Sequence, residues 1–225
     1  MTRVKICGLT REEDVDAVVD AGADAVGFIS GMPSSPRNLP ISRAASLISR
    51  IPPFVTPVLV TSGQALAENS DLVKRIAPKA IQLYDSMFSA ETLRSTFNAS
   101  LLKPFPVSRQ EGEGGGTDVL AKAKDAARGY DALLTDTYQK GVQGGTGLTS
   151  DWGTCGAIRK TIAPTPLILS GGLRPENVEL AIAMVAPYCV DVSSGVESAL
   201  GVKDPAKVRA FMGKASASAE RQAAR

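Results

Sequence analysis

The chain has 225 residues, of which 44% are apolar and 21% are charged. This length suits one large α/β domain with a substantial core, and the apolar share is too high for a disordered chain. The net charge is only +2, so the sequence offers no basic face and excludes nucleic acid as the main partner.

The sequence contains no histidine and only three cysteines, Cys7, Cys155 and Cys189. The absence of histidine excludes Ser-His-Asp and Cys-His nucleophiles, histidine bases and histidine-ligated zinc. An odd number of cysteines without paired spacing predicts neither a disulfide framework nor a metal site, and it favours a reducing cytoplasm. No apolar run reaches membrane-spanning length and no secretory signal is visible, so a membrane partner is not expected.

Short apolar runs alternate with amphipathic stretches along the whole chain, which is typical of strands followed by helices. The predicted strands cover 4–7, 24–29, 54–60, 79–84, 99–107, 131–136, 165–170 and 189–194. The predicted helices cover 12–23, 42–50, 65–76, 89–96, 118–127, 152–161, 174–186 and 204–215. The small, polar tail 216–225 is expected to fray.

Eight strand–helix units in a chain of this length predict a single-domain α/β fold, a (β/α)8 barrel with parallel strands over residues 1–215. A doubly wound open sheet is the alternative, but such sheets usually stop at five or six strands. In the barrel, active sites lie where the strands run into the following loops. The polar residues at those strand ends are therefore the candidates for function.

Two strand ends carry groups that can move a proton, Cys7 after the first strand and Asp136 after the sixth. A thiolate and a carboxylic acid form a workable base–acid pair where histidine is absent. A cysteine at a strand end is more often a small buried hydrophobe, whereas an aspartate there is more often functional. Side chains alternate along a strand, so Lys5 shares the face of Cys7, and its ammonium group could lower the pKa of the thiol.

Further polar groups follow other strands. The seventh and eighth strands end in "SGGL" and "SSGVE", and loops at these positions are the usual phosphate site of the barrel. A simple tight turn is the alternative explanation for the glycine pair. The candidate phosphate-binding residues are Gly171, Gly172, Leu173, Ser193, Ser194 and Gly195, and Lys5, Gln82 and Asp191 are candidate substrate-binding residues.

Two loops could act on a bound substrate. Gly144, Gly145, Thr146 and Gly147 form a glycine-rich segment that is typical of a lid, although a flexible connector would look the same. Arg37 follows the second strand and could bind a substrate carboxylate with its planar guanidinium group. A lone arginine on a loop is otherwise a solvated charge.

Five motifs, in order, together resemble the phosphoribosylanthranilate isomerase family over residues 3–211. They are "KICGLT", "DAVGFI" with "SPR", "LLTDT" with "GGTG" and "DW", "LILSGGLRPENV", and "VDVSSGVE" with "GVKD". The resemblance implies a (β/α)8 barrel in tryptophan biosynthesis, an aldose–ketose isomerase without cofactor or metal. The implied reaction is the Amadori rearrangement of N-(5-phosphoribosyl)anthranilate to 1-(2-carboxyphenylamino)-1-deoxyribulose 5-phosphate.

The resemblance also implies roles for the candidate residues. Asp136 would be the general acid that opens the ribose ring, and Cys7 would be the general base that removes the proton from C2. Arg37 would hold the anthranilate carboxylate, and Asp191 would lie near the sugar hydroxyl groups. The loops at 171–173 and 193–195 would hold the phosphate.

The sequence departs from the family pattern at four places. Tyr84 and Asp85 replace the His-Gly that the family commonly has, Ser150 replaces a Phe, and Asn38 replaces an aromatic residue. These changes affect the expected anthranilate pocket and lid, but they leave Cys7 and Asp136 in place.

Two other functions remain open. One is a related phosphosugar isomerase barrel of the histidine-pathway or dual-substrate type, although such barrels tend to carry Asp where this chain has Cys7. The other is a non-catalytic barrel that binds phosphorylated ligands. All three functions require a small phosphorylated molecule as ligand, and the sequence is compatible with a monomer or a homodimer.

Overall fold

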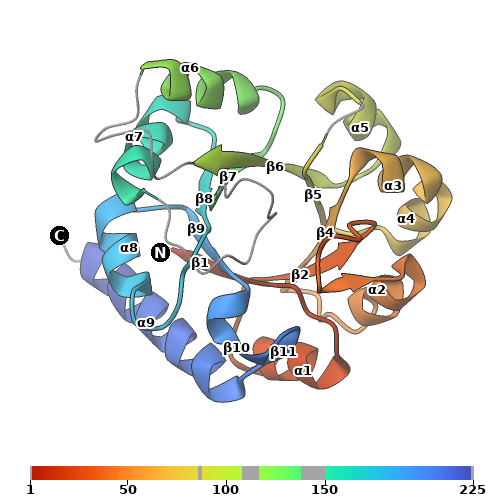
Figure 1. Ribbon diagram of the computed structural model, residues 1–225, viewed down its shortest axis with the longest axis horizontal. Coiled ribbons are helices and arrows are strands. Elements are labelled where there is room, and N and C mark those ends of the chain that lie inside the picture. Colours follow the sequence, from red (N-terminus) through yellow and green to blue (C-terminus); the bar gives the residue numbers. More distant parts are fainter. Residues whose placement is uncertain (1, 86–87, 108–116, 138–150, 224–225) are drawn as a thin grey trace.

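The computed structural model describes residues 2–85, 88–107, 117–137 and 151–223, and all eight predicted strands are present in it. Each strand pairs in parallel with its neighbours, and pairing of the first strand with the second closes the ring (Figure 1). The fold is thus the expected (β/α)8 barrel. The barrel strands are β1 (Arg3–Cys7), β2 (Ala25–Ser30), β4 (Thr56–Thr61), β5 (Ala80–Leu83), β6 (Ser100–Val107), β7 (Ala132–Thr137), β8 (Leu167–Leu169) and β9 (Cys189–Val192).

Three very short strands were not predicted. The two-residue strand β3 (Asn38–Leu39) pairs with the end of β2, and β10 (Glu197–Ala199) forms an antiparallel hairpin with β11 (Val202–Lys203). Segments of two or three residues are too short to show an alternating pattern in a sequence. The hairpin adds a small structure after β9, at the end of the barrel where the candidate residues lie.

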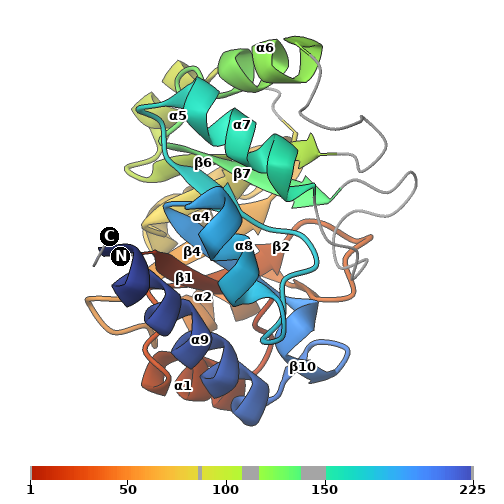
Figure 2. The same ribbon diagram turned by 90° about the vertical axis from the view of Figure 1, so that its left-hand side faces the viewer.

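The helices surround the strands, as Figures 1 and 2 show. They are α1 (Glu12–Asp20), α2 (Ile41–Ile48), α3 (Gly63–Glu68), α4 (Ser70–Ile76), α5 (Ala90–Thr96), α6 (Thr117–Ala126), α7 (Trp152–Ile162), α8 (Val178–Val185) and α9 (Pro205–Ala223). Figure 2 shows α7, α8 and α9 along the outside of the barrel.

Several helix boundaries differ from the prediction by a few residues, and two helices differ from it more strongly. The single helix expected at 65–76 is two helices, because Asn69 between them leaves the helical conformation (φ −116°, ψ 19°) and its side chain bonds to the carbonyl of Ala65. The last helix was expected to end at residue 215, but α9 continues to Ala223. The expected fraying of this tail stays a prediction.

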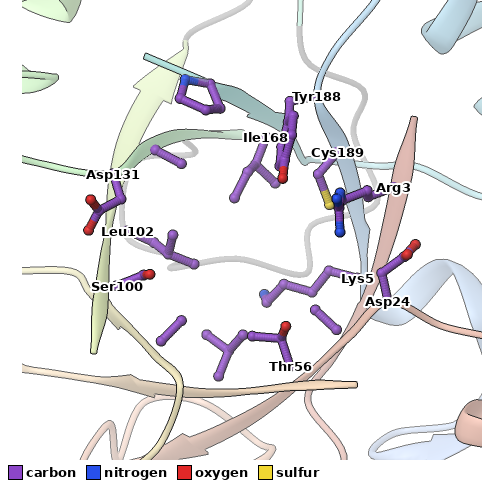
Figure 3. Close-up of a pocket in the computed structure, with 15 residues that line it drawn as sticks. Arg3, Lys5, Asp24, Thr56, Ser100, Leu102, Asp131, Ile168, Tyr188 and Cys189 are labelled. Carbon is purple, nitrogen blue, oxygen red and sulfur yellow. The ribbon is translucent and has the colours of Figure 1, made fainter. Parts of the chain in front are cut away.

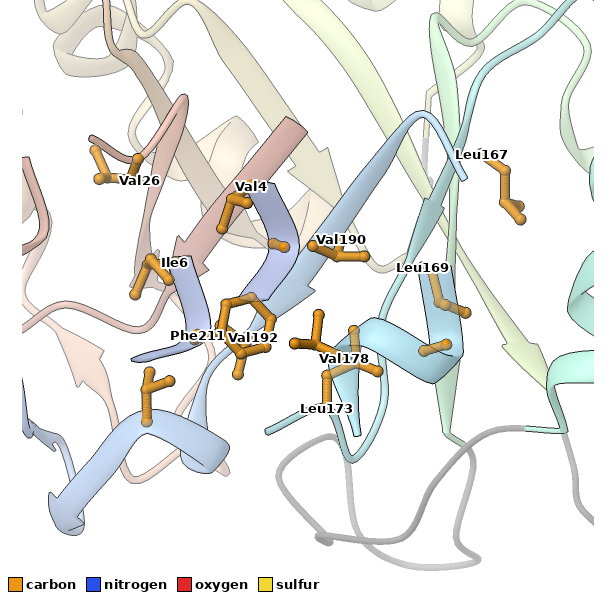
Figure 4. Close-up of a cluster of buried hydrophobic side chains, with 14 of the residues drawn as sticks. Val4, Ile6, Val26, Leu167, Leu169, Leu173, Val178, Val190, Val192 and Phe211 are labelled. Carbon is orange, nitrogen blue, oxygen red and sulfur yellow. The ribbon is translucent and has the colours of Figure 1, made fainter. Parts of the chain in front are cut away.

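Alternating side chains divide β1 between two environments, as the period of a strand requires. Val4 and Ile6 point outward and pack with Phe211 of α9 in the main apolar cluster (Figure 4). Lys5 and Cys7 belong to the opposite face, inside the barrel. The sequence prediction that these two residues share a face is confirmed.

The inside of the barrel changes along its axis. At the amino ends of the strands, a hollow of about 330 Å³ has a mainly apolar lining that includes Ala80 and Ile168, although charged side chains such as Lys5 and Asp131 also line it (Figure 3). Arg3 and Tyr188 lie at its rim in a cation–π contact, 5.4 Å from guanidinium carbon to ring centroid. Polar side chains gather at the opposite end. Among the helices that the structure describes, none is long and apolar enough to cross a membrane.

Candidate active site

Six of the predicted site residues meet in one hollow at the carboxyl ends of the strands. Side chains from β1, β5, β7 and β9 and from the loops after β2 and β9 converge there. The lining residues are Cys7, Ile29, Met32, Ser35, Arg37, Val60, Gln82, Tyr84, Asp136, Ser170, Asp191 and Ser193. We call this hollow the mouth.

Cys7 ends β1 with its thiol turned into the mouth, and it is 6% exposed. Its partner in the parallel register is Gly27 of β2. A Cβ atom at Gly27 would lie 2.7 Å from Cys7 Sγ, which is too close. Gly27 therefore provides the space for the thiol, a role that nothing in the local sequence indicates.

Lys5, one inward position deeper, is 1% exposed and makes two hydrogen bonds to other predicted site residues. Its Nζ donates to Asp191 Oδ1 at 3.0 Å and to Gln82 Oε1 at 3.1 Å. Burial by itself would lower the pKa of the Lys5 ammonium group, but Asp191 and Cys7 together outweigh burial, so that this pKa is raised. Three of the four predicted substrate-binding side chains, Lys5, Gln82 and Asp191, thus form a buried polar layer beneath Cys7.

The electrostatic surroundings of Cys7 contain opposing contributions. Burial raises the pKa of the Cys7 thiol, and Asp191 adds to this effect. The ammonium groups of Lys5 and Lys203 act in the opposite direction. Lys5 lowers the pKa of Cys7, as predicted. The effect of burial is larger, so the pKa of Cys7 is raised overall.

Asp136 lies near the end of β7, half-buried, and faces the same mouth. The hydroxyl group of Tyr84 donates a hydrogen bond to Asp136 Oδ2 at 3.0 Å. In the sequence, Tyr84 stands out only as a departure from the family pattern. This residue therefore contacts the candidate acid directly.

Arg37 is only 6% exposed, so it is not the solvated surface charge that a lone loop arginine suggests. Its Nε and Nη2 donate to the two carboxylate oxygens of Glu197, both at 2.6 Å. Glu197 also accepts from Lys203 Nζ at 2.9 Å, and the same Nζ donates to the carbonyl oxygen of Ser193 at 3.1 Å. This buried group ties the loop after β2 to the β10–β11 hairpin and the loop after β9.

The pKa of Glu197 is shifted by the same contacts. Burial would raise the pKa of this carboxyl group, but the hydrogen bonds from Arg37 and the charge of Lys203 outweigh burial and lower it. Sequence reasoning missed Glu197 and Lys203. Both stand in the motifs "VDVSSGVE" and "GVKD", yet nothing local indicates that their side chains meet.

The two predicted phosphate loops lie against each other. Gly171 and Gly172 both have positive φ, 95° and 63°, and Gly195 lies in the short 3-10 helix Ser194–Val196. A Cβ atom at Gly195 would overlap the carbonyl oxygen of Leu173, so only glycine permits this approach. Within the described part of the chain, Ser193 Oγ is buried without a hydrogen-bond partner.

One predicted element cannot be compared with the structure. The lid residues Gly144, Gly145, Thr146 and Gly147 lie outside the described residues. In the ranges that are described, no three His, Cys, Asp or Glu side chains form a group that could hold a metal ion.

Comparison with known proteins identifies the family. Residues 4–214 match the family model of N-(5'-phosphoribosyl)anthranilate isomerase. The N-(5'-phosphoribosyl)anthranilate isomerase of Haloferax volcanii is 45% identical over 215 residues, which are 94% of this chain and 92% of that protein.

Solved structures agree with this match. The crystal structure of phosphoribosyl anthranilate isomerase from Thermotoga maritima superposes with a TM-score of 0.80 at 35% identity, covering 96% of this chain and all of that one. A phosphoribosyl anthranilate isomerase in complex with reduced 1-(o-carboxyphenylamino)-1-deoxyribulose 5-phosphate gives a TM-score of 0.77 at 32% identity, with coverage of 96% and 100%. The chain belongs to the N-(5'-phosphoribosyl)anthranilate isomerase family.

Proposed function

We propose that this chain converts N-(5'-phosphoribosyl)anthranilate into 1-(o-carboxyphenylamino)-1-deoxyribulose 5-phosphate in tryptophan biosynthesis, with Asp136 as general acid and Cys7 as general base. The observation that carries the proposal is the convergence of these two side chains on one mouth from β1 and β7. Membership of the isomerase family supports the substrate.

Asp136 begins the reaction in its protonated form. It gives its proton to the ribose ring oxygen, and the C1–O bond breaks to give an open-chain Schiff base. Cys7, as a thiolate, then removes the proton from C2; the C–H electron pair forms the C1=C2 bond, and the π pair of the C1=N bond moves to the nitrogen to give an enolamine. Tautomerisation moves a proton from the C2 hydroxyl group to C1, which gives the ketone and leaves the overall composition unchanged.

The cationic groups around Cys7 support its role as base. A buried thiol keeps its proton more strongly than an exposed one, so the thiolate needs nearby positive charge. Lys5 and Lys203 both favour the thiolate. The two lysines therefore reduce the free energy that is needed to form the base in a buried place.

Substrate binding is assigned to the remaining residues. Glu197 holds two of the three guanidinium nitrogens of Arg37, and Nη1 is the nitrogen through which Arg37 binds the anthranilate carboxylate. Ser193, with its buried unpartnered hydroxyl group, is the first phosphate ligand, together with the loops at 171–173 and 193–195. Gln82 and Asp191 orient the sugar side of the mouth.

We also infer that the protein works in the cytoplasm as a monomer or homodimer. Three free, buried cysteines support a reducing compartment. Light scattering at several protein concentrations distinguishes the two assembly states.

A fluorescence assay tests the activity directly. Freshly made N-(5'-phosphoribosyl)anthranilate is mixed with the purified chain, and the anthranilate-type fluorescence is followed while it decays. We expect decay well above the spontaneous rate, with the rearranged product identified by mass and by its reducible keto group. A decay no faster than in the Asp136→Asn variant would remove the support for this function.

A further inference from the structure

Tyr84 links two strands that are not neighbours. It follows β5 directly, whereas Asp136 belongs to β7, and β6 lies between these strands in the sheet. The Tyr84 backbone N–H is anchored on the carbonyl oxygen of Thr61 at the end of β4 (3.2 Å). From this fixed position the side chain reaches across the mouth, and its hydroxyl group donates to Asp136 Oδ2 at 3.0 Å.

The surroundings of Tyr84 keep it in place as a donor. Its ring packs against the inward apolar cluster that includes Cys7 and Val60. Burial and the Asp136 carboxylate hold the pKa of Tyr84 well above its usual value. The phenol thus remains protonated, and its hydrogen is available to Asp136 throughout the neutral range.

We propose that Tyr84 is a positioning residue for Asp136: its hydroxyl group holds Oδ2, directs the acidic proton to Oδ1, and stabilises the carboxylate that forms when this proton is given away. The inference rests on the proposed role of Asp136 as general acid. A hydrogen bond to an ionised acceptor is about twice as strong as one between neutral groups. The bond from Tyr84 is therefore stronger after proton transfer than before, which favours the transfer.

A purely structural role for Tyr84 predicts a different experimental result. If the ring only fills space, the hydroxyl group can be removed without effect on the chemical step. If the hydroxyl group acts through Asp136, removing the hydroxyl group slows the chemical step only when residue 136 is an aspartate. A double-mutant cycle separates these two cases.

The experiment measures single-turnover rates with enzyme in excess, so that product release does not mask the chemistry. Four proteins form the cycle: wild type, Tyr84→Phe, Asp136→Asn and the double variant. Tyr188→Phe is the matched control, because it also removes a phenol hydroxyl group, but at the rim of the amino-end hollow, where Tyr188 is 49% exposed (Figure 3).

We expect Tyr84→Phe to lower the rate constant by about tenfold, the usual effect of losing a hydrogen bond to a charged group, with substrate affinity changed less than about twofold. In the Asp136→Asn background the same change should have almost no effect, and Tyr188→Phe should equal wild type. Thermal melting of each variant shows that it is folded.

Two results would overturn the inference alone: an unchanged rate in Tyr84→Phe, or an equal loss with Asp and with Asn at position 136. A wild-type chain without turnover would overturn the proposed function and this inference with it. The two failures are therefore distinguishable.

Discussion

Strand β7 has an aspartate at each end, and the two carboxylates do different work. Asp131 precedes the strand at the amino end, where its Oδ2 accepts from the backbone N–H of Leu101 on β6 at 2.7 Å and its Oδ1 pairs with the exposed Arg94. Asp24 does the same before β2, accepting from the N–H of Val4 on β1 at 2.8 Å. Asp136 instead faces the mouth, where it accepts a hydrogen bond from the hydroxyl group of Tyr84.

The two ends of the barrel differ in the same way. The amino-end hollow has a volume of about 330 Å³ and a mainly apolar lining, whereas the mouth holds about 70 Å³ between long polar side chains. Lys5 and Cys189 line the larger space, but the candidate acid and base, Asp136 and Cys7, both line the mouth. The polar groups that converge on one another lie at the carboxyl end, where the active sites of this barrel are generally found.

The same substitution at both ends of β7 tests whether the two aspartates have different roles, and we expect the largest difference here. Asp136→Asn keeps the size of the side chain but removes the acidic proton, and we expect turnover to fall by about 10²- to 10⁴-fold. Asp131→Asn should leave turnover unchanged and cost less than about 1 kcal/mol of stability, because its ion pair is exposed. Steady-state assays and urea unfolding of both variants measure this; equal activity losses would refute it.

Removing the charge of Glu197 tests how much its buried ion pairs with Arg37 and Lys203 contribute to the stability of the protein. Glu197→Gln leaves Arg37 and Lys203 as buried cations without a carboxylate, and we expect a loss of about 3 kcal/mol in the free energy of unfolding at pH 7. In the wild type, the lowered pKa of Glu197 adds stability at pH values above its unfolded pKa of about 4.3. This contribution is lost as the pH falls through the lower, folded pKa.

Urea unfolding between pH 7 and pH 3 measures both effects. The variant should be less stable at pH 7 and should lose less stability than the wild type on acidification. Identical pH dependence in the two proteins would show that Glu197 does not carry this charge interaction.

The cysteines offer a second matched pair, Cys7 at the mouth and Cys189 at the amino-end hollow. Cys7→Ser replaces the base by a hydroxyl group that does not ionise near neutral pH, and we expect about 100-fold slower turnover. Cys189→Ser places a hydroxyl group in an apolar setting, which should cost about 1–3 kcal/mol of stability without slowing turnover. Wild-type turnover in Cys7→Ser would make Cys7 a structural residue.

The smallest effect is expected from filling the amino-end hollow. Ala80→Val adds apolar volume inside β5, a strand that favours β-branched residues, and should raise the free energy of unfolding by about 0.5–2 kcal/mol. Turnover should stay within about twofold of wild type, because the change is far from the mouth. A stabilised but inactive variant would mean that the two ends are not independent.

Much of this protein can be predicted from local sequence. Eight strand–helix units follow from hydrophobic periods that neighbouring residues set by themselves, and the number of units selects the closed barrel. Closure then brings the strand ends together, so that Cys7 and Asp136 could be predicted to share one hollow without any knowledge of contacts. The two-residue strand β3 and the β10–β11 hairpin escaped prediction, because segments so short carry no period.

The sequence by itself therefore determined the barrel, its strand order and six of the residues that line the mouth. Only the tertiary structure decided which side chains pair: Lys5 with Asp191, Arg37 with Glu197, and Tyr84 with Asp136, separated by 186, 160 and 52 positions in the chain. The physical reason is that a buried charge or hydroxyl group must find a partner, and which partner is within reach depends on strand register and barrel closure. No local pattern in the sequence shows which of two distant side chains will lie within hydrogen-bonding distance.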